Sequence, residues 1–174
     1  MELLNKIIHK NISDINGNPS KRRTARGIIV NGSEILLMYT KFYNDYSFPG
    51  GGVNKEEDLK TALKRELYEE IGASKIEILK EYGMLEEYRP TSDPEYDFAY
   101  MESYFFVCQV EKELGTPNLE DYEIAHGMKP VWIDINKAIA HNKAVIDNKE
   151  ESMGLSIRRE TFVLEHIRDH LIKK

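Results

Sequence analysis

A glycine-rich turn that leads into an amphipathic helix constrains the fold of this chain most strongly. Pro49 and the glycines at 50–52 fit neither a helix interior nor a central strand, so they predict a turn whose backbone bends sharply and approaches a ligand closely. The helix is predicted to start at Asn54, a good N-cap with Glu57 in the capping-box position three residues later. Gly72 is predicted to end it.

The acidic residues of this helix lie where a purely structural helix would not place them. Its apolar residues recur every four positions, at Leu59, Leu63, Leu67 and Ile71. At about 100 degrees per residue, Glu66, Glu69 and Glu70 share one sector, and that sector overlaps the apolar stripe. Like charges this close destabilise a helix, and Arg65 alone cannot neutralise them. A hard divalent cation can, so the pattern predicts a site for Mg²⁺ or Mn²⁺.

The same residues resemble the Nudix box. Gly51 is followed after five residues by Glu57, and after seven more by the run Arg-Glu-Leu-Tyr-Glu-Glu-Ile-Gly-Ala at 65–73, which fills every fixed position of the box. An acidic amphipathic helix with a glycine-rich lead-in is the structural alternative, but it explains neither the spacing nor the acids on the apolar side. The resemblance implies a Nudix hydrolase of the α/β class with the Nudix fold, an α/β/α sandwich around a mixed sheet.

The resemblance also implies which groups bind the metal. Glu69 and Glu70 would be the main ligands of Mg²⁺ (or Mn²⁺), and the carbonyl of Gly50 or Gly51 would contribute a further oxygen. Glu66 would be either a ligand or the base that activates water. Hydrolysis of a phosphoanhydride needs this combination, because charge on the phosphate oxygens must be neutralised and a water molecule must be oriented and deprotonated.

Other residues would complete this site. By the resemblance, Arg65 would serve catalysis by orienting the acids through a bidentate ion pair, and Glu57 and Gly51 would support the site from the helix start and the turn. The family often adds one carboxylate from a distant loop as ligand or base. Glu123 is the first candidate, because it shortly precedes a predicted strand where the family commonly has this residue, and Glu120 is the second.

Strands alternate with helices over the rest of the chain. The predicted strands span residues 25–30, 34–39, 75–82, 98–110 and 131–133, and further helices are predicted at 134–140 and 153–172. Residues 86–96 and 111–129 are predicted to be long loops. Residues 1–23 are predicted to form an outlying β-hairpin, as an N-terminal β extension of a single domain spanning 1–174. This alternation also favours an α/β/α layered domain.

Charge and cysteine content narrow the setting in which the chain works. The net charge of −6 and a pI near 5.5 argue against nucleic acid as the main partner. No stretch approaches the roughly 20 apolar residues that cross a membrane, and the first apolar run is broken by Asn5 and Lys6, unlike a signal peptide. The single cysteine, Cys108, favours a cytoplasmic protein without disulfides. A monomer and a homodimer both stay open.

Two neighbouring stretches are candidates for contacts with a substrate. Arg26 and the basic residues at 21–23 either form a solvated strand end or offset the charge of a phosphate group. Tyr46 and Phe48, in the aromatic stretch 41–48, either stack on a nucleobase or pack the loop itself. The residue types alone do not decide between these alternatives.

The expected substrate is a small-molecule nucleotide whose identity stays open. A nucleoside triphosphate is favoured slightly, because the chain is short and shows no additional dimerisation domain. ADP-ribose and dinucleoside polyphosphates are the alternatives within the same reaction class. A Nudix-fold sensor that binds a nucleotide without turnover is the alternative from another class, and the complete set of box acids argues against it.

Overall fold

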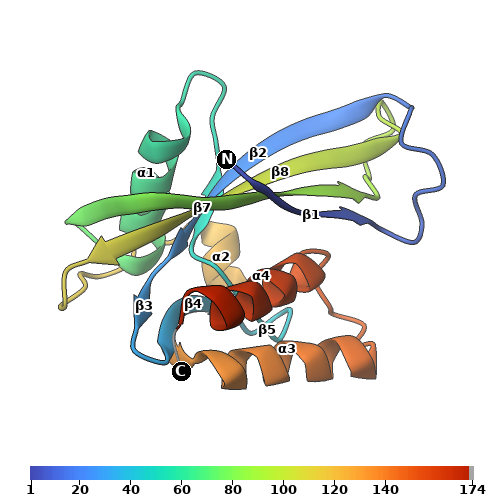
Figure 1. Ribbon diagram of the computed structural model, residues 1–174. Coiled ribbons are helices and arrows are strands. Elements are labelled where there is room, and N and C mark those ends of the chain that lie inside the picture. Colours follow the sequence, from blue (N-terminus) through green and yellow to red (C-terminus); the bar gives the residue numbers. More distant parts are fainter. Residues whose placement is uncertain (173–174) are drawn as a thin grey trace.

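Two β-sheets lie between helices in the computed structural model, which describes residues 1–172 (Figure 1). The strands are β1 (Leu3–Ile8), β2 (Pro19–Ile28), β3 (Val30–Asn31), β4 (Glu34–Thr40), β5 (Asp45–Ser47), β6 (Gly50–Gly52), β7 (Ile76–Arg89), β8 (Phe98–Val110) and β9 (Met128–Asp134). The helices are α1 (Leu59–Ile71), α2 (Asp121–Ala125), α3 (Ile135–Asn148) and α4 (Ile157–His170). Helix α1 covers one side of the sheets, and α3 and α4 cover the other, so the predicted α/β/α architecture is confirmed.

The larger sheet is mixed, as predicted. Within the described residues its strand order is β1-β7-β8-β2-β6, with β1 parallel to β7, β2 parallel to β8, and the remaining neighbours antiparallel. In the smaller sheet, β3, β5 and β9 all pair antiparallel with β4. The Asn31–Gly32 pair in the sequence predicts a hairpin at this point. The hairpin forms between β3 and β4, but its two-residue loop is Gly32–Ser33, with Gly32 at a positive φ of 61°.

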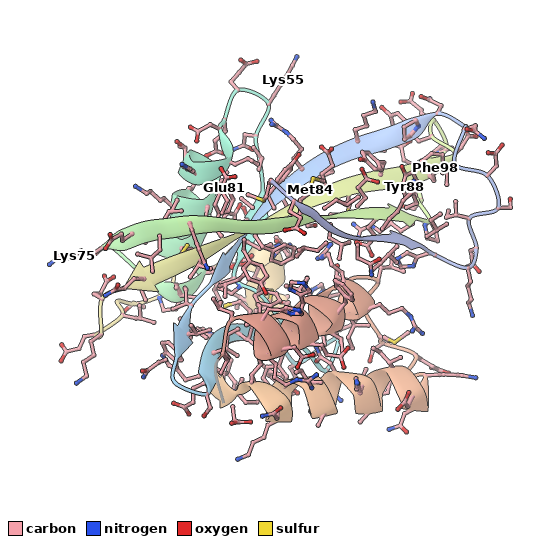
Figure 2. The ribbon with its side chains drawn as sticks, viewed as in Figure 1. Lys55, Lys75, Glu81, Met84, Tyr88 and Phe98 are labelled. Carbon is pink, nitrogen blue, oxygen red and sulfur yellow. The ribbon has the colours of Figure 1, made fainter. Side chains whose placement is uncertain are left out.

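Apolar side chains form a core on each side of the sheets. The core beneath α1 contains Ala62, Leu63, Leu67 and Ile71 from the helix, together with Ala25, Leu36, Met38 and Phe106 from the strands. The other core joins α3 and α4 to the opposite faces of the sheets through Ile28, Leu37, Phe105, Ile139, Val163 and Leu164. Figure 2 shows the side chains that fill these layers. Each helix is held by burial of one apolar stripe.

The prediction that residues 49–52 form only a turn is wrong, because Gly50–Gly52 form the short strand β6, which pairs antiparallel with β2 at the edge of the larger sheet. Residues 49–52 are called the glycine turn below.

Helix α1 begins four residues later than the sequence suggested. Asp58 is its N-cap and accepts hydrogen bonds from the N–H groups of Lys60 and Thr61. Asn54 was the predicted N-cap, and that prediction is wrong because Asp58 satisfies these first free N–H groups instead. Glu57 still accepts from the N–H of Asn54 at 3.2 Å, but within the turn that precedes the helix. Gly72 ends the helix at φ 68°, as predicted.

The N-terminal hairpin does not form. Strand β1 pairs in parallel with β7, from Leu3 opposite Met84 to Ile8 opposite Tyr88, while β2 lies on the far side of β8. A local turn signal at 16–19 suggested that the two strands were neighbours, but Pro19 already belongs to β2. Parallel pairing with a strand some 80 residues away leaves no local mark in the sequence.

Strand β7 is longer than predicted. It continues through Arg89, which pairs with Ala99 of β8, so the predicted loop is confined to residues 90–97. The charged residues and the two following prolines suggested a loop from residue 86, yet β8 provides ladder partners up to Arg89. At this end of the two strands the rings of Tyr88 and Phe98 pack 5.7 Å apart (Figure 2).

Three further element boundaries differ from the predictions. The predicted loop at 111–129 contains the short helix α2, helix α3 runs to Asn148 rather than ending near 140, and α4 begins at Ile157. Weak apolar periodicity explains these differences, because short or charged helical turns resemble loops in a single sequence. Among residues 1–172, none of the helices has the length and apolar character needed to cross a membrane.

Candidate active site

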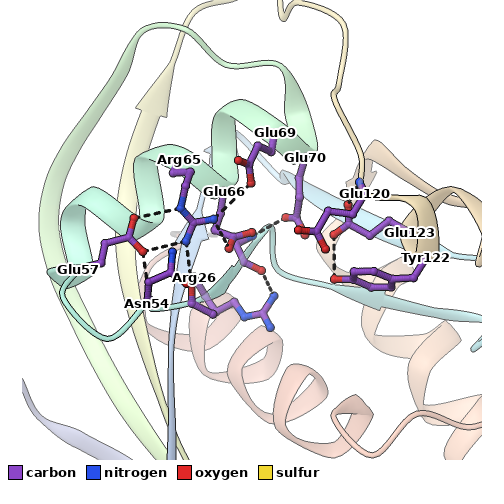
Figure 3. A network of polar contacts seen from close by, with 12 residues as sticks. Arg26, Asn54, Glu57, Arg65, Glu66, Glu69, Glu70, Glu120, Tyr122 and Glu123 are labelled. Carbon is purple, nitrogen blue, oxygen red and sulfur yellow. Dashed lines mark hydrogen bonds and ion pairs between the residues drawn. The ribbon is translucent and has the colours of Figure 1, made fainter.

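A cavity of about 710 Å³ opens between the glycine turn, α1, one face of β2, the loop before β9 and the start of α4. Two opposed sets of charged side chains line it. The acidic wall is made of Glu66, Glu69, Glu70, Glu120 and Glu123. The arginine wall is made of Arg22, Arg26, Arg89 and Arg159. The site candidates proposed from the α1 sequence thus share one cavity with Glu123 and Glu120 from the distant loop (Figure 3).

Arg65 organises the acids of α1. It donates from Nε and Nη2 to the two carboxylate oxygens of Glu57, at 3.0 and 2.9 Å. Its Nη1 donates to Glu66 at 2.7 Å and to Glu69 at 3.3 Å, and Nη2 also reaches the carbonyl of Gly52 at 3.0 Å. The hydrogen bond from Arg65 lowers the pKa of Glu57. One planar guanidinium therefore fixes three carboxylates against the turn (Figure 3).

Glu70 is the acid held deepest. Its side chain is buried, and one oxygen accepts a hydrogen bond from the Gly50 N–H at 2.5 Å. Burial raises the pKa of Glu70 to about 8, although Arg26 and the Gly50 N–H oppose the shift, and the charges of Glu123 and Glu66 raise the pKa further. The ionised form of Glu70 thus lacks sufficient positive charge around it, which a bound cation would supply.

The glycines bring the turn into contact with these acids. Gly50 has a φ of 123°, and a Cβ placed there would collide with the carbonyl of Ala25 in the adjacent strand. A Cβ on Gly51 would overlap the carboxylate of Glu66. The Gly50 carbonyl, a predicted metal ligand, accepts a hydrogen bond from Arg26 Nη1. The close approach of backbone to acids therefore requires glycine at these positions.

Glu123 and Glu120 reach the cavity from the first turn of α2. The Glu120 N–H donates to Glu123 Oε2 at 2.7 Å in a capping box. The Tyr122 hydroxyl donates to the other oxygen of Glu123 at 3.2 Å. Glu123 is buried and close enough to Glu70 to affect its pKa. The sequence did not predict the helix that holds these residues, and the role of Glu123 as ligand or base stays a prediction.

The acidic wall fits a divalent cation by its chemistry. Carboxylate oxygens are the ligands that Mg²⁺ and Mn²⁺ prefer, and Glu66, Glu69, Glu70 and Glu123 would supply them. Within residues 1–172 no three acidic, histidine or cysteine side chains are already grouped around one point. Arg65 donates to one oxygen each of Glu66 and Glu69, and the Gly50 N–H donates to one oxygen of Glu70. Each carboxylate keeps further lone pairs for a cation, so these hydrogen bonds are compatible with ligation.

The aromatic candidates lie elsewhere. The ring of Phe48 is fully buried and packs edge-on against Phe105 at 5.3 Å. Tyr46 packs between Tyr39 and His141, with ring centroids 5.1 and 5.0 Å away. Neither residue lines the cavity. The core covers the ring of Phe48, which leaves no face for stacking on a nucleobase. Tyr46 is half-buried and packs against neighbouring rings outside the cavity lining.

A buried ion-pair network was missed from the sequence. Arg159 of α4 is 1% exposed and bonds to Glu87 of β7 at 2.9 Å and to Glu160 at 2.6 Å. Glu160 also accepts the Phe48 N–H at 3.0 Å, next to the glycine turn. His9 of β1 reaches the other oxygen of Glu87 at 2.8 Å. The sequence signal for this network was the pair Arg159 and Glu160 in the last helix. Helical spacing places both residues on the side of that helix that faces the core.

A family model described as the NUDIX domain matches residues 21–153 of the chain. Two solved structures share the fold. The E. coli ORF135 protein has a TM-score of 0.56 and 17% sequence identity, and the match covers 90% of this chain and 96% of that one. A NUDIX hydrolase from Nitrosomonas europaea has a TM-score of 0.58 and 17% sequence identity, and the match covers 86% of this chain and 90% of that one. The family match includes the glycine turn, α1 and Glu123.

Among curated proteins the similarity is local. An RNA pyrophosphohydrolase of Campylobacter jejuni is 54% identical over 39 residues, which is 22% of this chain and 25% of that protein. An RNA pyrophosphohydrolase of Actinobacillus pleuropneumoniae is 37% identical over 54 residues, 30% of this chain and 26% of that protein. The chain therefore spans about a quarter of the length of these curated relatives.

Proposed function

The chain belongs to the Nudix family, and from this premise we propose that it is a pyrophosphohydrolase that depends on Mg²⁺ or Mn²⁺ and cleaves a phosphoanhydride bond of a nucleotide. One observation supports this most. Carboxylates from α1 and α2, far apart in the sequence, line a single cavity with the glycine turn and an arginine wall opposite. Carboxylates can bind a divalent cation and arginines can bind phosphate groups, so a site that combines both suits a polyphosphate substrate.

Each residue has a role that follows from its contacts. Glu69, Glu70 and Glu66 would hold the cation, with Glu123 as a further ligand. A bound divalent cation supplies positive charge to the phosphate oxygens as the anhydride bond breaks. Arg65 keeps the carboxylates turned toward the glycine turn through its hydrogen bonds. Glu57 fixes Arg65 in turn, so its effect on the reaction is indirect.

A carboxylate must also accept a proton from the attacking water. Glu66 and Glu123 are the two candidates, and both line the cavity. Burial raises the pKa of Glu66 while Arg65 opposes that rise, which brings the carboxylate nearer to the range useful for a general base. Glu123 is buried and keeps one oxygen next to the Tyr122 hydroxyl. Comparison of the pH–rate profiles of the Glu66→Gln and Glu123→Gln variants identifies the base.

The leading substrate is a nucleoside triphosphate, and ADP-ribose and dinucleoside polyphosphates are alternatives within the same reaction. The 5′ end of RNA is a second candidate, favoured by the local similarity to the two RNA pyrophosphohydrolases. The net charge of −6 favours a small nucleotide over a long polyanion. A single domain over residues 1–174, a monomer or homodimer, and a cytoplasmic setting complete the proposal. The single cysteine, which is buried, suits a reducing compartment.

A substrate panel tests this function. The protein is incubated with Mg²⁺ and, separately, with nucleoside triphosphates, ADP-ribose, dinucleoside polyphosphates and a short RNA with a 5′-triphosphate, and the products are separated by anion-exchange chromatography. Release of a nucleoside monophosphate, or of RNA with a 5′-monophosphate, supports a pyrophosphohydrolase and identifies its class of substrate. Tight binding of one nucleotide without any product from the panel would instead favour a Nudix-fold sensor.

A further inference from the structure

The arginine wall is more than a solvated strand end. Arg22 and Arg26 lie four residues apart in β2, on the face of the sheet that lines the cavity. Arg89 lies on the same side, near the end of β7, and Arg159 faces it from α4. Arg22 also borders the glycine turn, since its Nη2 lies 3.1 Å from where a Cβ on Gly52 would be. The wall therefore runs from the glycine turn to the far end of β7.

Two of these four guanidinium groups lack a protein partner among residues 1–172. Arg159 is paired, because Glu87 and Glu160 both bond to it. The guanidinium groups of Arg22 and Arg89 make no hydrogen bond and no ion pair with any side chain or carbonyl group of the described residues. Arg26 gives one nitrogen to backbone carbonyls, but its Nε is buried without a partner in this part of the chain. Three arginines thus present unused donors around one cavity.

Part of the positive charge of the wall is also uncompensated. Glu87 and Glu160 pair with Arg159, and Glu160, Glu70 and Glu66 interact electrostatically with Arg26. Among residues 1–172, this leaves Arg22 and Arg89 without a paired carboxylate. Burial lowers the pKa of Arg89; Glu87 opposes this, and the nearby arginines Arg159, Arg22 and Arg26 lower it further. Arg22 is exposed, whereas Arg26 and Arg89 are half-buried. Like charges at half-buried positions destabilise the protein unless an anion binds among them. Together with the free donors, this points to an anionic ligand.

We propose that Arg22, Arg26 and Arg89 bind a phosphate group beyond the bond that is cleaved, so that the site selects substrates with three or more phosphates in a row. The position of the cleaved bond rests on the proposed function, which places it over the acidic wall. Planar guanidinium groups match phosphate oxygens with paired hydrogen bonds, and a terminal phosphate carries a charge of about −2, which would offset the charges of Arg22 and Arg89. A cavity of about 710 Å³ is large enough for a nucleoside triphosphate.

This arrangement separates the substrates that the fold leaves open. In ADP-ribose both phosphates flank the single cleaved bond, so both would lie over the acidic wall and the arginines would face an uncharged ribose. A triphosphate, a dinucleoside polyphosphate or a 5′-triphosphate end places a further phosphate on the arginine wall. The enzyme should therefore use triphosphates in preference to ADP-ribose, and the preference should depend on Arg22 and Arg89.

Binding of inorganic tripolyphosphate tests the arginine wall without any hydrolysis. Calorimetric titration at low salt with EDTA compares the wild type with Arg22→Gln, Arg89→Gln and Arg89→Lys. Arg23→Gln is the matched control, because Arg23 is an exposed neighbour in β2 that does not line the cavity. Each glutamine variant at Arg22 or Arg89 should weaken binding roughly tenfold, or about 1.4 kcal/mol. Arg89→Lys should retain part of the affinity, and Arg23→Gln should match the wild type.

The same variants distinguish phosphate binding from a structural role. Arg89→Gln should melt at the same temperature as the wild type or higher, because it removes an unpaired half-buried charge; a structural arginine would lower the melting temperature. With Mg²⁺, the variant should raise KM for a nucleoside triphosphate much more than KM for ADP-ribose, while Arg23→Gln leaves both KM values at those of the wild type. Equal tripolyphosphate affinities for wild type and Arg89→Gln, or no binding by the wild type, would overturn the inference. If the protein hydrolyses nucleotides but the arginine variants bind tripolyphosphate as tightly as the wild type, the inference fails and the proposed function stands. If tripolyphosphate binding depends on the arginines but no nucleotide is hydrolysed, the proposed function fails and phosphate binding by the arginine wall stands.

Discussion

At the scale of single residues, the site depends on charged groups whose compensation is incomplete in the protein alone. Arg65 binds Glu57, Glu66 and Glu69, whereas the Gly50 N–H is the only hydrogen-bond donor to Glu70 within residues 1–172. Its pKa of about 8 shows that its negative charge is costly where it lies. The acids and the arginines on opposite sides of the cavity thus both lack counter-charges, and a metal–polyphosphate complex would supply both.

The carboxyl group of Asp45, which lines the cavity, is expected to make the stability of the protein depend on pH. Burial raises its pKa to about 7, and the charge of Glu160 adds to the shift while Arg159 opposes it. In the unfolded chain the carboxyl group has a pKa near its ordinary value of 3.8. Between these values the unfolded state releases its proton first, so Asp45 lowers stability progressively as the pH rises from about 4 to about 7.

Replacement of Asp45 by Asn should remove this pH dependence. The amide has a similar shape and no charge, so the free energy of unfolding of Asp45→Asn relative to wild type should grow by up to roughly 1.4 kcal/mol per pH unit across this window. Urea denaturation at pH 4.5, 5.5, 6.5 and 7.5 measures the difference. A constant difference across the four pH values would show that the folded carboxyl group has an ordinary pKa.

At the scale of elements, the position of α4 relative to β7 and the glycine turn depends on one buried arginine. Arg159→Met should lower stability by about 3–5 kcal/mol, because Glu87 and Glu160 would remain buried without their partner. Arg158→Met is the matched control, since Arg158 is the exposed neighbour on the same helix. Urea midpoints measure the effect. A midpoint for Arg159→Met equal to that of the control would mean that the network contributes little.

The function of the glycine turn depends on its exact backbone geometry. Gly32→Ala, in the β3–β4 loop, is the comparison variant. It should lower the free energy of unfolding by about 1–2 kcal/mol, because the positive φ is strained for alanine while the space around Gly32 is open. Gly50→Ala should cost considerably more and reduce metal binding as well, because the added Cβ meets the backbone of Ala25 and displaces the donor of Glu70. Thermal melts and Mn²⁺ titration of both variants measure this. Equal losses of stability, with Mn²⁺ affinity intact in both, would contradict the role given to the turn.

At the scale of the whole molecule, local patterns predicted the elements that carry the acids, and long-range pairing decided the rest. Apolar spacing and Gly72 predicted α1, and the Asn31–Gly32 turn predicted β3–β4, because each signal lies within a few residues. The parallel pairing of β1 with β7 joins residues about 80 positions apart and has no such signal. Most of the acidic wall was therefore predictable, since it lies on one helix.

The arginine wall was only partly predictable for the same reason. Arg26 stood out in a basic run on a predicted strand, whereas Arg89 lay in a predicted loop and Arg159 in a helix whose role looked purely structural. Their meeting depends on the order β7-β8-β2 and on the packing of α4 against that sheet. For Phe48 the local sequence was misleading. Its position beside the glycine turn suggested a contact with a ligand, but its ring is buried in the core.

The Mg²⁺-dependent hydrolysis of a nucleoside triphosphate by wild type, Glu70→Gln and Glu56→Gln tests the central claim most directly. Glu56 is an exposed acid of the turn outside the cavity, so its variant controls for net charge. Glu70→Gln should reduce kcat roughly 10²- to 10³-fold, with a melting temperature at pH 7 no lower than that of wild type, while Glu56→Gln keeps full activity. An unchanged rate in a folded Glu70→Gln protein would contradict the claim that these acids bind the catalytic cation.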